Sequence, residues 1–175
     1  KFTSTSKISF PGSGIAAVAA SKANLDDFRK YMTVQTIGHD KLNQLRHVKF
    51  FKDLEGVHAH MKKHAAILRP KFEMVEATLE KELGGLGIGE WTTPKGGYFI
   101  SFESLDGCAK KIVAMAKEAG VVMTGAGATY PYGKDPKDSN IRIAPSFPPI
   151  EELEKAAQVF VVCVKLASVE KLLAE

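Results

Sequence analysis

The sequence has 175 residues, of which 45% are hydrophobic and 25% charged, enough to bury the core of one domain, or of one domain and a remnant of another. Its 24 basic and 20 acidic residues give a net charge of +4 and are scattered, which argues against a nucleic-acid-binding patch. No apolar run is long enough to cross a membrane. Cys108 and Cys163 share no metal-ligand spacing and predict reduced core thiols of a cytoplasmic protein, a single disulfide being the alternative.

One lysine near the start stands among small hydroxyl residues, in the run Ser4-Thr5-Ser6-Lys7. A lysine that is removed from water loses its proton more easily and can attack a carbonyl group to form a Schiff base. The hydroxyls of Ser4 and Ser6, with nearby backbone N–H groups, can hold an anion such as a phosphate ester. For these four residues taken alone, an exposed lysine at a strand end is the alternative.

A strand and two helices are predicted next. Residues 15–20 are small and apolar and predict a buried strand that returns from the lysine loop. Asn24 is expected to cap a helix over residues 25–36. A second helix is indicated by an apolar stripe, which consists of Leu42, Leu45 and Val48.

Residues 53–83 form the longest periodic stretch and predict a helix that Pro70 kinks or divides. Its expected buried positions step by three or four residues: Val57, Met61, Ala65, Leu68, Phe72, Val75 and Leu79. His60 and His64 have a metal-ligand spacing but no fixed third ligand, so we interpret them as part of a solvated face and predict no metal site. The glycine-rich residues 84–89 follow a helix instead of a strand, and they predict a connector and not a phosphate loop.

A β-hairpin is predicted after this connector, with residues 91–93 and 98–102 as its arms. Along the second arm, Tyr98, Ile100 and Phe102 are expected to share one face. Asp106 is then expected to cap a helix whose buried side is Ile112, Val113, Met115 and Ala116. A short strand over residues 121–123 and a long loop over residues 124–139 follow.

The last predicted strand covers residues 140–144 and carries Arg142 between two isoleucines. Because side chains alternate along a strand, Arg142 points away from its apolar neighbours, where a carboxylate would suit its fork of donors. An ordinary ion pair is the alternative. A final helix is predicted over residues 150–174, with Leu153, Ala157, Phe160, Val164 and Leu172 facing inward.

Four segments together resemble landmarks of the fold-type I pyridoxal-phosphate aminotransferases, in the family's order. They are Ser4-x-Ser6-Lys7 with Gly12 and Gly14, Pro94-Lys95-Gly96-Gly97-Tyr98-Phe99, the stretch from Gly120 to Gly127, and Asn140-Ile141-Arg142-Ile143-Ala144. The similarity covers essentially the whole chain. It is closest to the aspartate-aminotransferase-like group that includes relatives of MocR-type regulators.

The resemblance implies roles for particular residues. Lys7 would carry pyridoxal 5'-phosphate as a Schiff base and move the substrate's proton, and Ser4 and Ser6 would help to hold the phosphate. Arg142 would bind the α-carboxylate of the substrate. Tyr130, together with Tyr132, is a candidate for contact with the substrate or a second subunit. Many relatives bind the phosphate with an arginine at the position that Ile15 occupies in this sequence.

The resemblance also implies an α/β protein, with an α+β two-layer arrangement for the isolated small domain. Residues 1–45 would be a remnant of the large cofactor-binding domain and residues 46–175 the small C-terminal domain. Because the lysine motif normally lies past the middle of such enzymes, the chain is expected to be the C-terminal part of a homodimeric aminotransferase, inactive alone, that acts on an amino acid and a 2-oxo acid. The alternatives are the non-catalytic sensor domain of a MocR-type regulator and a structural subunit.

Overall fold

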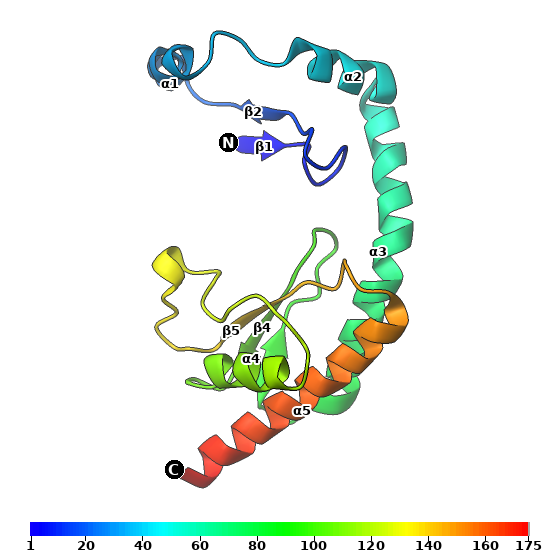
Figure 1. Ribbon diagram of the computed structural model, residues 1–175, viewed down its shortest axis with the longest axis vertical. Helices are drawn as coiled ribbons and strands as arrows, with labels where there is room; N and C mark the ends of the chain where they lie inside the picture. The colour runs from blue at the N-terminus through cyan, green and yellow to red at the C-terminus, as the bar shows by residue number, and fades with distance from the viewer. Residues whose placement is uncertain (175) are drawn as a thin grey trace. The chain divides into compact units, whose positions relative to one another are not determined.

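A computed structural model of the protein describes residues 1–174 (Figure 1). The chain forms two compact units, Lys1–Ala66 and Ile67–Glu175. The long helix α3, Leu54–Leu83, begins in the first unit and ends in the second. The boundary expected at residues 45 and 46 concerns the domains of a parent enzyme and stays a prediction. Within residues 1–174, no helix combines the length and apolar character that a bilayer span requires.

The first unit contains a two-stranded antiparallel ribbon and two helices, besides the start of α3. Strand β1, Phe2–Ser4, pairs with β2, Ala16–Val18, and Thr3 lies opposite Ala17. The strand predicted after the lysine loop is therefore present, but Ala16 and Ala17 are exposed and not buried as expected. A ribbon of three-residue strands has too few side chains to bury its own faces.

Helices α1, Lys22–Gln35, and α2, Lys41–Phe51, correct two details of the sequence prediction. Ser21, and not Asn24, caps α1, because its hydroxyl accepts the N–H of Asn24 at 3.3 Å. The apolar stripe expected to be buried on α2, Leu42, Leu45 and Val48, is exposed. The buried residues of α2 are His47 and Phe51 instead.

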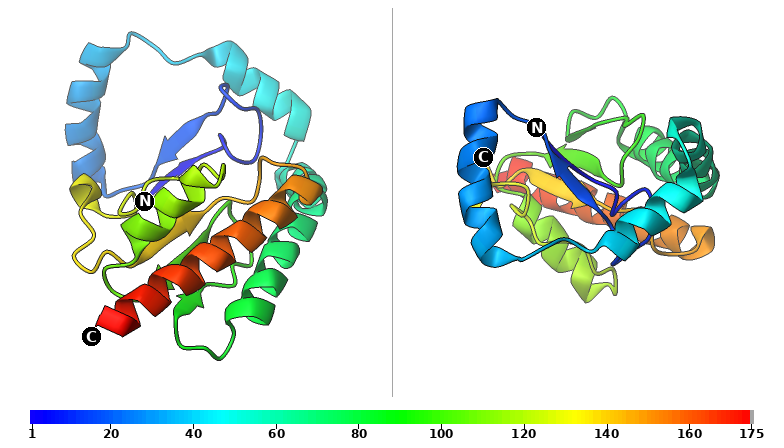
Figure 2. Two further views of the ribbon diagram at one scale, coloured as in Figure 1. Left: turned by 60° about the horizontal axis from the view of Figure 1, so that its bottom comes forward. Right: turned by 90° about the horizontal axis from the view of Figure 1, so that it is seen from above.

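The second unit is built on a three-stranded antiparallel sheet in the order β3-β4-β5. The strands are β3, Gly89–Trp91, β4, Ile100–Ser104, and β5, Asn140–Ile143. They confirm the strand that carries Arg142 and the antiparallel pairing of the predicted hairpin, but the paired strands are residues 89–91 and 100–104 and not 91–93 and 98–102. Helices α4, Ala109–Glu118, and α5, Ile150–Ala174, cover the sheet, and a 3-10 turn, η1, Pro131–Gly133, lies in the long loop (Figure 2). This helix-on-sheet layering confirms the predicted fold class.

The expected strand over residues 121–123 is wrong, because the end of α4 uses the hydrogen-bonding group that such a strand needs. Gly120 has a φ of +91°, and its N–H donates to Lys117 O at 3.0 Å. The N–H of Val121 donates to Ala116 O at 2.8 Å. These two bonds form a Schellman motif that ends the helix.

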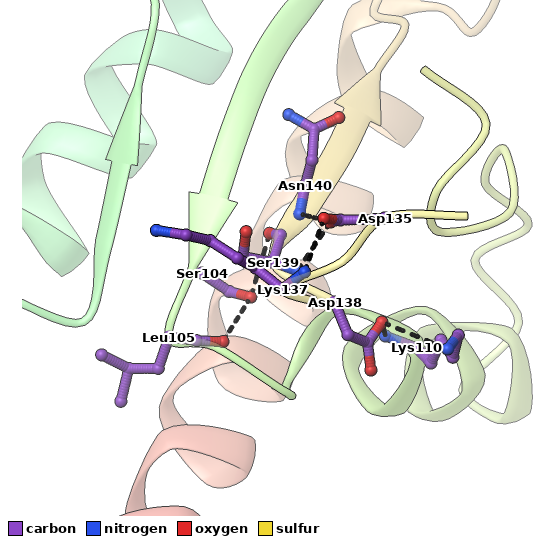
Figure 3. Close-up of polar contacts among 8 residues, drawn as sticks. All are labelled: Ser104, Leu105, Lys110, Asp135, Lys137, Asp138, Ser139 and Asn140. Carbon is purple, nitrogen blue, oxygen red and sulfur yellow. Dashed lines mark hydrogen bonds and ion pairs between the residues drawn. The ribbon is translucent and has the colours of Figure 1, made fainter. Parts of the chain in front are cut away.

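The expected cap of α4 is also wrong, because the cap comes from a distant loop. The N–H of Ala109 donates to Asp138 O at 2.8 Å, and the N–H of Lys110 donates to Asp138 Oδ1 at 3.2 Å. Figure 3 shows Asp138 beside Lys110 at this helix start. Asp106 takes no part in the cap, since the helix begins three residues later.

The core of the second unit lies between one face of the sheet and the helices. Phe102 is fully buried, with its ring edge-on to Phe160 of α5 at 5.1 Å between centroids.

The buried faces of the three helices agree in most positions with those predicted. Helix α3 runs undivided through Pro70 and buries Val75, Leu79 and Leu83, whereas Met61 is exposed. On α5, four of the five predicted inward residues are buried, and Leu172 is 55% exposed because it lies in the helix's last turn. On α4, Ile112 and Ala116 are buried and Val113 and Met115 are half-buried.

Leu79→Ala tests this core. Leu79 has no exposed surface, so its truncation should lower the free energy of unfolding by about 2–5 kcal/mol through lost burial and the cavity left behind. Leu86→Ala removes the same atoms from an exposed position in the same unit and should cost less than about 1 kcal/mol. Urea unfolding of both variants makes the comparison, and equal losses would contradict the assignment of Leu79 to the core.

Candidate active site

Lys7 lies on an exposed turn directly after β1. The hydroxyls of Ser4 and Ser6 are 3.2 Å apart, and the N–H of Ser6 donates to Ser4 Oγ at 3.3 Å. The two hydroxyls are therefore held close together on the turn that carries Lys7. Lys7 is exposed among the described residues and is not removed from water by them.

The base of this turn is closed by Thr5 and Ile15. The N–H of Thr5 donates to Ile15 O, and the N–H of Ile15 donates to Thr5 Oγ1, both at 2.8 Å. A Cβ on Gly14 would lie 2.3 Å from Ser6 Oγ and 2.9 Å from Ser6 Cα, so only glycine allows this approach. Ile15 thus closes the turn through its main chain and contributes no charge.

His47 of α2 lies against the turn and was missed by the sequence reasoning. It is 4% exposed, with Nε2 at 2.8 Å from Ser9 Oγ and 3.2 Å from Thr5 Oγ1. A signal for it exists in the spacing of Asn43, His47 and Phe51, which lie four residues apart on one helix face. Nothing in the sequence indicates that this face meets the lysine turn.

In the second unit, the sheet face opposite the core is polar. Ser101 lies opposite Arg142 and Glu103 lies opposite Asn140 across the β4–β5 pair, while Ile141 and Ile143 are buried on the other face. Opposed residues of an antiparallel pair share a face. The prediction that Arg142 points away from its apolar neighbours therefore agrees with this register.

Arg142 is a cation without a carboxylate partner among residues 1–174. Its guanidinium carbon lies 4.4 Å from the ring centroid of Phe99, and Nη2 donates to Thr124 Oγ1 at 3.3 Å. Its Nε is buried and has no hydrogen-bond partner within the described chain. A guanidinium that is stacked, oriented and incompletely bonded is suited to bind a carboxylate.

The loop over residues 124–139 is held by Asp135, as Figure 3 shows. One of its carboxylate oxygens accepts the N–H groups of Ser139 and Asn140, each at 2.8 Å, and the other accepts that of Lys137 at 3.0 Å. These bonds, that of Asn140 foremost, hold the pKa of Asp135 below its usual value. The end of the loop is thereby fixed where it enters β5.

The Asn140 side chain joins the same loop to the sheet. Its Nδ2 donates to Ser101 Oγ at 2.8 Å and to a carboxylate oxygen of Glu103, and its Oδ1 accepts from Thr129 Oγ1 at 2.5 Å. Ser139 Oγ donates to the second oxygen of Glu103 at 2.9 Å. The loop is therefore an ordered part of the polar face.

Tyr130 and Tyr132 lie at and within η1 of this loop. Tyr132 is 96% exposed and adopts a φ of +59°, which is rare for a residue with a side chain. The side chain of Tyr130 is 36% exposed. Both stay candidates for contact with a substrate or a second subunit. In the described part of the chain, no three potential metal-ligating residues cluster together.

Comparison with known proteins places the chain in a family. A model described as aspartate amino-transferase matches residues 1–175. An aspartate aminotransferase of Corynebacterium glutamicum is 46% identical over 169 residues, which are 97% of this chain and 39% of that protein. The chain thus spans about two fifths of the relative's length.

Solved structures agree with this match. An aspartate transaminase from Corynebacterium glutamicum superposes with a TM-score of 0.92 at 46% identity, over 97% of this chain and 40% of that one. An α-aminoadipate aminotransferase from Thermus thermophilus, complexed with N-(5'-phosphopyridoxyl)-L-leucine, has a TM-score of 0.76 at 20% identity, over 94% and 41%. The class is that of the fold-type I pyridoxal-phosphate aminotransferases. Within this class, the chain belongs to the aspartate aminotransferase family.

Asp135→Asn should lower stability at neutral pH and weaken its dependence on acid. Because the folded-state pKa of Asp135 lies below the unfolded value of 3.8, its stabilisation is present above about pH 4 and is lost as the pH falls through the folded pKa. The urea midpoints of wild type and variant should therefore differ at pH 7 and converge as the pH falls below the folded-state pKa of Asp135. Asp106→Asn, at an exposed turn, is the control, and an equal shift in both variants would contradict the role of Asp135.

Proposed function

We propose that these residues form the C-terminal part of a pyridoxal-phosphate-dependent aminotransferase, which transfers an amino group between an amino acid and a 2-oxo acid. The family match supports this activity. The match to only 39–42% of the relatives' lengths supports a division of the active site between this segment and other parts of the enzyme, so the segment alone should have little turnover. The structural observation that carries the proposal is Arg142, a guanidinium with no carboxylate partner in the described chain.

The residues of the lysine turn fit the cofactor's chemistry. The exposed Lys7 Nζ can attach the cofactor covalently, and the paired hydroxyls of Ser4 and Ser6 offer donors for its phosphate. Gly14 leaves Ser6 unobstructed, because any side chain at this position would collide with the Ser6 hydroxyl. When bound, pyridoxal phosphate supplies an electron sink for the electrons left at the substrate's Cα.

The chain's own residues would then have separate tasks. Lys7 Nζ acts as the base that removes the proton from the substrate's Cα, and in the reverse half-reaction, from the 2-oxo acid, it delivers a proton to that Cα. Arg142 binds the α-carboxylate through two parallel N–H···O bonds and so orients the Cα–H bond. Tyr130 contacts the substrate or a second subunit. The homodimer and the cytoplasmic location stay predictions, the latter supported by the buried thiols of Cys108 and Cys163, which form no disulfide within the described chain.

Lys7→Ala tests the covalent role. The full-length protein is incubated with pyridoxal phosphate and reduced with borohydride, and the labelled peptide is identified by mass spectrometry. Wild type should carry the label on Lys7, and the variant should lose it while retaining scattered labelling of other lysines. Lys22→Ala, which removes an exposed lysine of the same unit, should leave the labelling of Lys7 intact. Absence of label on Lys7 in the wild type would refute the proposal.

Arg142→Lys tests the carboxylate role. Lysine keeps the charge but loses the fork of donors, so KM for the amino acid should rise about tenfold or more, in keeping with about 1.5–3 kcal/mol for a charged hydrogen bond. Arg69→Lys makes the same change at an exposed position of α3 and should leave KM unchanged. Steady-state kinetics of the full-length enzyme measure both. An unchanged KM in Arg142→Lys would remove this residue from the substrate site.

A further inference from the structure

His47 lies where helix α2 contacts both ends of the lysine turn. We propose that His47 is a positioning residue: by bonding to Thr5 and Ser9, it fixes the turn that presents Lys7. This inference rests on the proposed function, since it assigns a task to His47 only through Lys7. Neither the sequence motifs nor the family match points to this residue.

The hydrogen-bond partners of His47 indicate which of its ring nitrogens donates and which accepts. Its Nδ1 lies 2.9 Å from Asn43 O, and because a carbonyl oxygen only accepts, Nδ1 carries the proton and donates. Nε2 is then an acceptor within reach of both hydroxyls, Ser9 Oγ at 2.8 Å and Thr5 Oγ1 at 3.2 Å. Each hydroxyl also has a backbone acceptor, Thr5 O at 2.9 Å for Ser9 and Ile15 O at 3.3 Å for Thr5. The helix backbone therefore orients the ring, and the ring orients the turn.

The two hydroxyl partners stand on opposite sides of the lysine. Thr5 is two residues before Lys7 and Ser9 is two residues after it. The turn between them is closed by Thr5 O, which accepts the N–H groups of Ile8 at 3.0 Å and Ser9 at 2.8 Å. One buried nitrogen thus holds both ends of a five-residue segment whose middle residue is Lys7.

Neighbouring residues of α2 hold the chain that leaves the turn. The ring of Phe10 meets His47 edge-on, with 5.3 Å between centroids. Arg46 covers the Phe10 ring, at 5.3 Å from its centroid, and Asn43 Nδ2 donates to Ser13 O at 2.8 Å. One face of α2 therefore acts as a rigid support for residues 5–13.

Substitutions at position 47 can distinguish a hydrogen-bonding role of His47 from a role in packing alone. Phenylalanine at position 47 keeps the ring packing against Phe10 but has no nitrogen, so the turn loses its anchor. Glutamine places a polar group near the position of Nε2, whereas asparagine reaches only the position of Nδ1. The turn should consequently loosen in His47→Phe and His47→Asn and be restored in part in His47→Gln.

Hydrogen exchange of the Ile8 and Ser9 amides in the full-length protein provides the first measurement. In His47→Phe, exchange at these amides should accelerate about tenfold, in keeping with the loss of about one net hydrogen bond. His47→Gln should recover part of the protection. His58→Phe, which changes an exposed histidine of α3, should leave both amides as in the wild type.

Labelling of Lys7 with pyridoxal phosphate and borohydride provides the second measurement. The rate of label incorporation on Lys7 should fall severalfold in His47→Phe and recover in His47→Gln, while the labelling of other lysines stays constant. Unchanged amide exchange and unchanged labelling of Lys7 in His47→Phe would overturn the proposal. So would a failure of His47→Gln to differ from His47→Phe.

Two further cases are a His47→Phe variant that does not fold and a wild type that carries no label on Lys7. If His47→Phe does not fold, Ser9→Ala removes the hydroxyl nearer to Nε2 and leaves the bonds between Thr5 and Ile15 in place. A loss of protection at Ile8 is then expected, and retained protection would count against His47 as the anchor. If the wild type carries no label on Lys7, the proposed function fails. Amide exchange then still shows whether His47 holds the turn.

Discussion

The pairing of β4 with β5 places apolar side chains on one face of the sheet in the second unit and polar side chains on the other. Because side chains alternate along each strand, Ile100, Phe102, Ile141 and Ile143 share one face. That face carries the core of the unit. The opposite face receives Ser101, Glu103, Asn140 and Arg142. A shift of the register by one residue would bring Arg142 into the core and isoleucines into the candidate site. The stability of the unit and the orientation of the candidate substrate-binding arginine therefore depend on the same register.

The lysine turn is ordered by a different kind of interaction. Its ribbon, β1 and β2, has exposed strand residues and cannot be stabilised by a core of its own. Hydrogen bonds hold it instead: Thr5 to Ile15 across its base, and His47 to Thr5 and Ser9 beneath it. An exposed, polar segment held in this way can present a reactive amine without burying it. The loop over residues 124–139 follows the same principle, with Asp135 and Asn140 as its anchors.

Elements with a strong local signal could be predicted, and those that depend on distant partners could not. The long periodic stretches became α3 and α5, and the segment with Gly96 and Gly97 connects the strands of the β3–β4 hairpin. The strand expected over residues 121–123 failed, because the Schellman bonds of Gly120 and Val121 end α4 there. The cap expected from Asp106 failed, because Asp138 approaches α4 from the far side of a loop. The candidate site residues Ser4, Ser6, Lys7 and Arg142 were found because they lie in sequence motifs. His47 lies in no such motif and was missed.

The sequence by itself determined the family, the reactive residue types and the alternation that turns Arg142 away from the core. These features are local in the chain or carried by ordered motifs, so neighbouring residues suffice to read them. Only the tertiary structure decided that Arg142 lacks a carboxylate partner within the described chain, and that a buried histidine supports the lysine turn. Thr5 and His47 are 42 residues apart. A hydrogen bond over such a separation exists only once the helix and the turn are packed together, and no local pattern of residues encodes it.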